Sequence, residues 1–161
     1  MKQVEIYTDG AALGNPGPGG YGVILRYGEH VKEFSGGFRK TTNNRMEILA
    51  AIVGLESLKE KCRVIITSDS RYLVDSVTKR WVYRWKANNW KRGTRDQVPN
   101  ADLWERLLNQ LQTHSVEFRW IRGHNGHEEN ERCDELATTA ASQSTLPVDT
   151  GYVSSSARNG T

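Results

Sequence analysis

Three acidic residues stand in segments whose other residues are mostly apolar. Asp9 follows an alternating strand pattern, Glu47 lies inside an apolar helix pattern, and Asp69 ends a nearly continuous apolar run. Burying a lone carboxylate costs several kcal/mol unless it is paired or binds a metal. A salt bridge to Arg45 is the alternative for one of the three. Converging carboxylates stay ionised together around cations, and all-oxygen donors suit Mg²⁺ or Mn²⁺. Carboxylate sites that hold two such ions serve phosphodiester chemistry.

The segments that must position these residues follow an order typical of an α/β fold. Strand patterns cover residues 4–12, 21–27, 31–39, 63–69 and 116–121. Helix patterns cover 46–58, 71–78, 81–92, 100–111 and 128–141. The first three strands have short connections and predict an antiparallel meander, and the last two alternate with helices. We therefore expect a mixed five-stranded sheet, three antiparallel strands and then two parallel ones, with helices on both faces.

Length and composition indicate one globular domain. The 161 residues are 37% hydrophobic and carry a net charge of only +3. No apolar run approaches the roughly 20 residues that span a bilayer. The chain enters a strand pattern at once, which indicates no signal peptide. Cys62 and Cys133 read as reduced core thiols. We expect a cytoplasmic monomer with one domain over residues 1–142 and a polar, mobile tail over 143–161.

One stretch of the chain is strongly basic and rich in tryptophan. Between Tyr72 and Gly93 the only acidic residue is Asp75, against the cations Lys79, Arg80, Arg84, Lys86, Lys91 and Arg92. Lysine and arginine bind phosphates, and interleaved tryptophans can lie against sugars or bases. The alternative is a helix whose tryptophans pack into the core while its charges are solvated. We expect Trp85 and Trp90 to be divided between these two roles, and Trp104 and Trp120 to be core residues.

Four motifs together resemble bacterial ribonuclease H of the type 1 class. They are Tyr7–Gly10, Thr42–Glu47, Thr67–Ser70 and Gly123–Asp134, and the likeness runs over nearly the whole chain. The resemblance implies a ribonuclease H-like fold. It also implies that the metal-binding catalytic carboxylates are Asp9, Glu47, Asp69 and Asp134. Taken alone, Asp134 reads as a solvated helix residue.

The resemblance also implies a role for His124, which helps a proton or the product to leave. A glycine-flanked histidine is free to move and titrates near neutral pH. Without the neighbouring motif, His124 reads as an ordinary surface residue, and we expect His127 either to be one or to have a structural packing role.

An activity and a set of substrate contacts follow from the same resemblance. The family hydrolyses the RNA strand of RNA–DNA hybrids without sequence recognition and leaves 3′-hydroxyl and 5′-phosphate ends. Two Mg²⁺ ions serve in catalysis, with Mn²⁺ as a substitute. Amides at Asn15, Asn43 and Asn44 lie in the minor-groove contact region, although capping is an equal alternative for the last two. Phosphate contacts fall at Lys40, Thr42 and Asn100, and a basic protrusion at about 80–93 contributes Arg80, Trp81, Arg84, Trp85, Lys86, Trp90, Lys91 and Arg92.

Two residues depart from the family pattern. Many relatives have arginine at the position of Lys40, and lysine offers a point charge in place of a bidentate fork. Close relatives often have glutamine at the position of Arg71, where arginine adds attraction for phosphate. Two rival functions stay open: another nuclease or strand-transfer enzyme on the same scaffold, and a non-catalytic module that binds hybrids.

Overall fold

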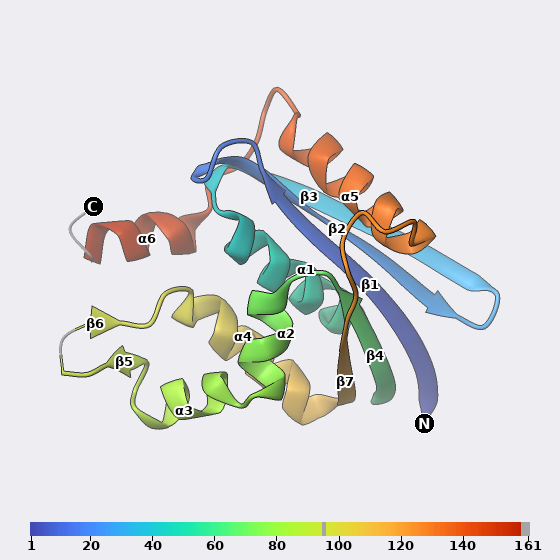
Figure 1. Ribbon diagram of the computed structural model, residues 1–161, viewed down its shortest axis with the longest axis horizontal. Coiled ribbons are helices and arrows are strands. Elements are labelled where there is room, and N and C mark those ends of the chain that lie inside the picture. Colours follow the sequence, from blue (N-terminus) through green and yellow to red (C-terminus); the bar gives the residue numbers. More distant parts are fainter. Residues whose placement is uncertain (95, 159–161) are drawn as a thin grey trace.

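A mixed five-stranded sheet forms the centre of the molecule (Figure 1). The computed structural model describes residues 1–94 and 96–158. The sheet order is β3-β2-β1-β4-β7. Its strands are β1 (Lys2–Ala12), β2 (Gly17–Tyr27), β3 (His30–Thr41), β4 (Cys62–Ser68) and β7 (Ser115–Trp120). The first three are antiparallel, and β4 and β7 run parallel to β1. The predicted sheet is therefore confirmed.

Helices cover both faces of this sheet, as predicted. They are α1 (Asn43–Glu56), α2 (Arg71–Thr78), α3 (Trp81–Ala87), α4 (Ala101–Thr113), α5 (Glu128–Ala141) and α6 (Thr150–Arg158). Neighbouring residues of β2 face opposite helices, since a Cβ on Gly22 would meet Cys133 of α5 while Val23 lies beside Gly54 of α1. Figure 1 shows α5 on one side of the sheet and α1 and α4 on the other. Within the described ranges, no helix has the length and apolarity needed to cross a membrane.

The core lies mainly between the sheet and α1. This helix is buried around most of its circumference, as its wide apolar arc predicts. Trp104 is fully buried, as expected for a core residue. The same prediction for Trp120 is wrong, because its side chain is 39% exposed. Trp120 ends β7, and β7 is an edge strand, so the sheet covers this residue from one side only.

The basic stretch forms a protrusion from the main body. Helix α3 is followed by a two-stranded ladder of β5 (Lys91–Arg92) and β6 (Asp96–Gln97), which the sequence does not predict. In Figure 1 these elements project from the side of the molecule away from α5. Arg92 and Asp96 pair across the ladder, so Lys91 and Arg92 lie on one of its two strands.

The segment expected to be a mobile tail is partly attached to the domain. The amide of Arg39 donates to the carbonyl of Pro147, and the Thr41 hydroxyl donates to Asp149 at 2.7 Å. Asp149 is buried, and helix α6 follows it. The sequence therefore missed one helix and one anchoring carboxylate. The last part of the predicted tail, residues 159–161, lies outside the described residues.

Candidate active site

Three of the predicted carboxylates meet at one edge of the sheet. One oxygen each of Asp9, Glu47 and Asp69 lies within 4.8 Å of the others, although the residues come from β1, α1 and the end of β4. We call these three residues the carboxylate group. Thirty-eight and twenty-two residues of chain separate its members, so the fold brings them together and the local sequence does not.

Strand register explains why Asp9 and Asp69 are neighbours. β1 and β4 are parallel, and the last pair between them is Thr8 with Ser68. The next residue on each strand is therefore an aspartate, at the same level of the sheet. Because β4 ends at Ser68, Asp69 lies one residue beyond the regular strand.

A glycine allows the third carboxylate to approach. A Cβ on Gly10 would lie 2.5 Å from the backbone nitrogen of Glu47, which is too close for any side chain. Gly10 therefore lets α1 pack directly against β1 beside Asp9. A glycine beside Asp9 in a strand pattern predicts that another segment approaches the backbone closely there, which the structure confirms, but the sequence does not show that this segment is α1.

The carboxylate group is buried and self-repelling. Asp9 is 5% exposed and Glu47 is 9% exposed. Burial, followed by the charges of Asp69 and Asp134, raises the pKa of Asp9 to about 8. Burial, followed by the charges of Asp9 and Asp69, raises the pKa of Glu47 well above its usual value. Oxygen Oε1 of Glu47 is buried and has no hydrogen-bond partner among the described residues.

No basic side chain in the described part of the protein neutralises this group. Arg45, the alternative partner, directs its guanidinium to Asp102 and Asp149 at 2.8 Å each. The salt-bridge alternative is therefore wrong. Three converging oxygen donors, one of them an orphaned buried atom, fit a hard divalent cation, which supplies the missing positive charge.

A pH dependence of stability follows from the raised pKa of Asp9. Without a divalent cation, the unfolded chain loses this proton near pH 4 and the folded protein keeps it to about pH 8. Stability therefore falls as pH rises through this window. Urea unfolding in EDTA at pH 5 and pH 8 should show wild type losing at least about 1 kcal/mol more than Asp9→Asn, the equivalent of one pKa unit. Equal losses would contradict the account.

Asp134 lies close to the carboxylate group but is not one of its three members. It extends from α5, and its charge contributes to the raised pKa of Asp9. Its oxygens are outside the set that lies within 4.8 Å. The structure thus places this predicted ligand beside Asp9, at the edge of the site.

His124 is exposed on the loop that joins β7 to α5, with a left-handed backbone at φ 55°. The preceding residue, Gly123, lies against the carboxylate group, because a Cβ there would be 2.6 Å from Oδ2 of Asp69. The loop therefore passes directly beside the site, and the His124 side chain is exposed there. His127 instead caps α5, and its Nδ1 accepts from the amide of Asn130.

The predicted minor-groove amides lie on the loop between β1 and β2 and on the first turn of α1. The side chain of Asn15 accepts a hydrogen bond from the amide of Asn43 at 3.2 Å. Thr42, and not either asparagine, is the residue that caps α1. Asn43 and Asn44 are exposed on the first turn of the helix, four and three residues before Glu47 respectively. Their amide side chains are thus displayed close to the carboxylate group.

The residues predicted to contact phosphates differ in what positions their side chains. Asn100 adopts a left-handed backbone, and its amide donates to the Tyr72 hydroxyl at 3.1 Å. The same hydroxyl accepts from the indole of Trp104, so Tyr72 fixes the position of Asn100. Lys40 is exposed near the end of β3.

The protrusion presents both free and paired side chains. Trp85 packs 6.1 Å from Trp104, and Trp90 donates its indole N–H to Glu105 at 2.8 Å. Both tryptophans are partly buried, so each keeps an exposed portion. Lys86 is also paired with Glu105. The other predicted contacts of this region are exposed or partly exposed: Arg80, Trp81, Arg84, Lys91 and Arg92.

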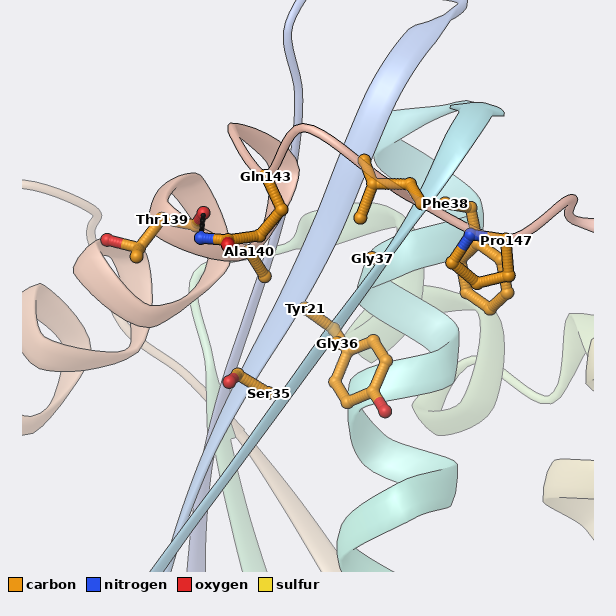
Figure 2. Close-up of a pocket in the computed structure, with 10 residues that line it drawn as sticks. Tyr21, Ser35, Gly36, Gly37, Phe38, Thr139, Ala140, Gln143 and Pro147 are labelled. Atoms are coloured by element: carbon orange, nitrogen blue, oxygen red, sulfur yellow. Dashed lines mark hydrogen bonds between the residues drawn. The ribbon is translucent and has the colours of Figure 1, made fainter.

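A surface depression elsewhere on the molecule has a different character. Figure 2 shows it between β3, the end of α5 and the segment that contains Pro147. It is lined by glycines, small polar residues and apolar side chains, and Tyr21 is the only titratable residue in its lining. None of the carboxylate group lines it. The depression therefore offers no chemistry comparable to the acidic edge of the sheet.

The sheet order and the carboxylate group define an enzyme of the ribonuclease H-like superfamily. The RNase H family model matches residues 1–142. A protein named "Ribonuclease H" from Syntrophus aciditrophicus is 62% identical over 152 residues, which are 94% of this chain and 88% of that protein.

Solved structures agree with this assignment. The crystal structure of LC9-RNase H1, described as a type 1 RNase H with the type 2 active-site motif, matches with a TM-score of 0.79 and 36% identity, over 98% of this chain and 85% of that one. LC11-RNase H1, solved in complex with an RNA/DNA hybrid, matches with a TM-score of 0.66 and 26% identity, over 86% and 96% of the two chains. The chain belongs to the ribonuclease H family, as a type 1 enzyme of the bacterial kind.

Proposed function

We propose that this enzyme is an endonuclease that hydrolyses the RNA strand of RNA–DNA hybrids, leaving 3′-hydroxyl and 5′-phosphate ends. The observation that carries the proposal is the carboxylate group, which gathers at one sheet edge close to exposed amides. The similar protein LC11-RNase H1 was solved with an RNA/DNA hybrid, which supports the same substrate here. Recognition depends on the shape and backbone of the hybrid and not on its sequence.

The proposed cofactor is Mg²⁺, with two ions during catalysis and Mn²⁺ as a substitute. Asp9, Glu47, Asp69 and Asp134 would hold them. When bound, such ions lower the pKa of the attacking water and stabilise the leaving oxygen. The protein contributes the arrangement: Asp9 and Asp69 sit at one level of two neighbouring strands, and Glu47 closes the group from α1. Asp134, which lies beside Asp9, would complete the set of ligands.

His124 serves as the mobile proton carrier in this proposal. It lies next to Gly123, which touches Asp69, yet its side chain is exposed. We expect His124→Ala to lower kcat by roughly 100-fold, at the lower end of general acid–base effects, with KM little changed. Rates measured across pH 6 to 9 should lose one titration step in the variant. An unchanged pH profile would count against a proton-handling role, and His127→Ala serves as a control outside this role.

The hybrid would lie across the amides, the carboxylate group and the protrusion. Asn15, Asn43 and Asn44 would read the 2′-hydroxyls of the RNA strand in the minor groove. Phosphates of the DNA strand would bind at Lys40, Thr42 and Asn100. The exposed side chains of the protrusion, together with Arg71, would add backbone contacts: Arg80, Trp81, Arg84, Trp85, Lys86, Trp90, Lys91 and Arg92.

Salt dependence gives a direct measure of the protrusion's contribution. Removing one side chain that binds a phosphate should reduce the slope of log K against log salt by about 1. We therefore expect Lys91→Ala combined with Arg92→Ala to flatten the slope by about 2 when hybrid binding is measured in Ca²⁺ or EDTA. Lys59→Ala is the matched control, because Lys59 lies near the start of β4, at the opposite end from Asp69. Equal slopes in all three proteins would refute phosphate binding by this hairpin.

One comparison of substrates separates the proposal from its rivals. Labelled RNA–DNA hybrid, double-stranded RNA and double-stranded DNA are each incubated with and without Mg²⁺. We expect cleavage of the RNA strand of the hybrid, and only with the ion. Cleavage of double-stranded DNA would favour another nuclease or strand-transfer activity. Binding without cleavage would favour a non-catalytic module, although a pure binder has no use for clustered negative charge facing phosphates.

We also propose the organisation in which the enzyme acts. Residues 1–142 form a single catalytic domain with the protrusion at about 80–93, and the contacts of Pro147 and Asp149 attach the segment that follows. The enzyme would act as a monomer in the cytoplasm. Sedimentation at micromolar concentration tests the proposed monomeric state, and a dimer would contradict it.

A further inference from the structure

Trp120 makes a contact with the carboxylate group that its exposure does not suggest. Its indole N–H donates to the backbone carbonyl of Asp69 at 3.1 Å, although its side chain is 39% exposed. The indole therefore makes a directed hydrogen bond to Asp69 while part of its surface stays open to solvent.

The backbone carbonyl of Asp69 lies just beyond the end of β4, where the backbone pairing with β7 has ended. β4 ends at Ser68, and the last pair between β4 and β7 is Ser68 with Trp120. The amide of Ile121 still bonds the carbonyl of Ser68 at 3.0 Å, which is the last rung of the ladder. The peptide of Asp69 comes one step later, and a side chain takes over the role that backbone pairing plays along the strand.

The same indole also supports Arg71 on its face. The guanidinium carbon of Arg71 lies 3.8 Å from the ring centroid of Trp120, within the range of cation–π contacts. Among the described residues, no carboxylate forms a salt bridge with Arg71. A guanidinium that stacks flat on a ring keeps its N–H edge free for a phosphate.

We propose that Trp120 is a positioning residue for the reaction: its indole N–H fixes the Asp69 carboxylate for metal binding, and its face holds Arg71 for a substrate phosphate next to that metal site. The role in phosphate binding rests on the proposed function, and the role toward the metal does not. The two roles use different parts of one side chain. Each can therefore be removed separately.

Trp120→Phe removes the N–H and keeps an aromatic face for Arg71. Calorimetric titration of the free enzyme with Mg²⁺ should show an affinity about two- to tenfold weaker, the equivalent of one neutral hydrogen bond. Cleavage should show a lower kcat with KM within about twofold of wild type, on the same scale of one hydrogen bond. Wild-type Mg²⁺ affinity and kcat in a folded Trp120→Phe protein would overturn the role toward Asp69.

Arg71→Gln is the matched variant for the other role. It should leave Mg²⁺ affinity at the wild-type value and raise KM, because the substitution removes only the group that binds phosphate. Trp120→Leu lacks both the N–H and the ring, so it should weaken Mg²⁺ binding and raise KM together. A KM that stays at the wild-type value in both variants would overturn the role toward Arg71.

Wild-type protein allows a measurement that needs no variant. In ¹⁵N-labelled enzyme, the indole N–H resonance of Trp120 should shift during Mg²⁺ titration, because its acceptor belongs to a metal ligand. The indole of buried Trp104, which bonds Tyr72, is the internal control and should not move. A stationary Trp120 resonance at saturating Mg²⁺ would contradict the inference. If wild type bound Mg²⁺ but cut no hybrid, the proposed function would fail while this readout still decided the metal role.

Discussion

Replacing Asp9 with asparagine is expected to abolish cleavage of an RNA–DNA hybrid, with a rate loss of about a thousandfold or more. A bound divalent ion supplies several kcal/mol of transition-state stabilisation, and each 1.36 kcal/mol corresponds to a factor of about ten in rate. Asparagine keeps the shape of the side chain but removes the charge that holds the ion. One oxygen each of Asp9, Glu47 and Asp69 lies within 4.8 Å of the others, so the substitution removes one of three carboxylates that would hold the same ion. Single-turnover cleavage of labelled hybrid in Mg²⁺ measures the effect.

The fold and the binding surface should survive this substitution. The proposed phosphate and amide contacts lie on other side chains, so hybrid binding stays detectable. The variant should also be more stable than wild type at pH 8 in EDTA, since it lacks a carboxyl whose pKa is raised to about 8. Asp75→Asn is the matched control, because Asp75 pairs with Lys79 on α2, outside the carboxylate group. Full activity of Asp9→Asn, or of the equivalent Asp69→Asn, would refute the assigned roles.

Replacing Arg45 with alanine is expected to cost about 3–5 kcal/mol of stability, the usual result of removing one partner from a buried ion pair. Arg45 is 2% exposed. Its Nε donates to Asp149 at 2.8 Å, and its two terminal nitrogens donate to Asp102 at 2.9 and 2.8 Å. This arginine therefore joins α1, the start of α4 and the segment before α6. Its removal leaves the buried carboxylate of Asp149 with the Thr41 hydroxyl and the Tyr152 amide as its remaining donors among the described residues.

Urea unfolding at pH 7 measures this loss. Arg106→Ala is the control, since Arg106 makes a comparable two-pronged contact with Glu56 on the surface. An exposed pair contributes about 0–1 kcal/mol. We expect the Arg45 variant to lose several times more than the control. Similar losses in the two variants would show that burial of Arg45 contributes little.

The sequence predicted the sheet and the carboxylate group for a common reason. Alternation and apolar runs mark strands, and an acidic residue inside such a run stands out. Asp9, Glu47 and Asp69 were all visible in this way, and parallel register then brought two of them together. Asp134 gave no such signal, because acidic residues surround it on α5. Only the family resemblance singled it out.

Contacts between residues far apart in the chain could not be predicted from the sequence. Asp149 lies in a polar segment that reads as a tail, and its partner Arg45 is 104 positions away. Trp120 continues an alternating pattern that suggests a core residue, yet its strand is at the sheet edge. The left-handed backbone of Asn100 is a further case, since its neighbours Tyr72 and Trp104 decide its orientation. In each case tertiary packing outweighed the local pattern.

The most direct test of the central claim is a crystal of the enzyme grown or soaked with millimolar Mn²⁺ and measured at the manganese absorption edge. We expect anomalous density between Asp9, Glu47 and Asp69, with carboxylate oxygens as its ligands. Manganese bound only at other sites, with these three side chains free of any ion, would contradict the account.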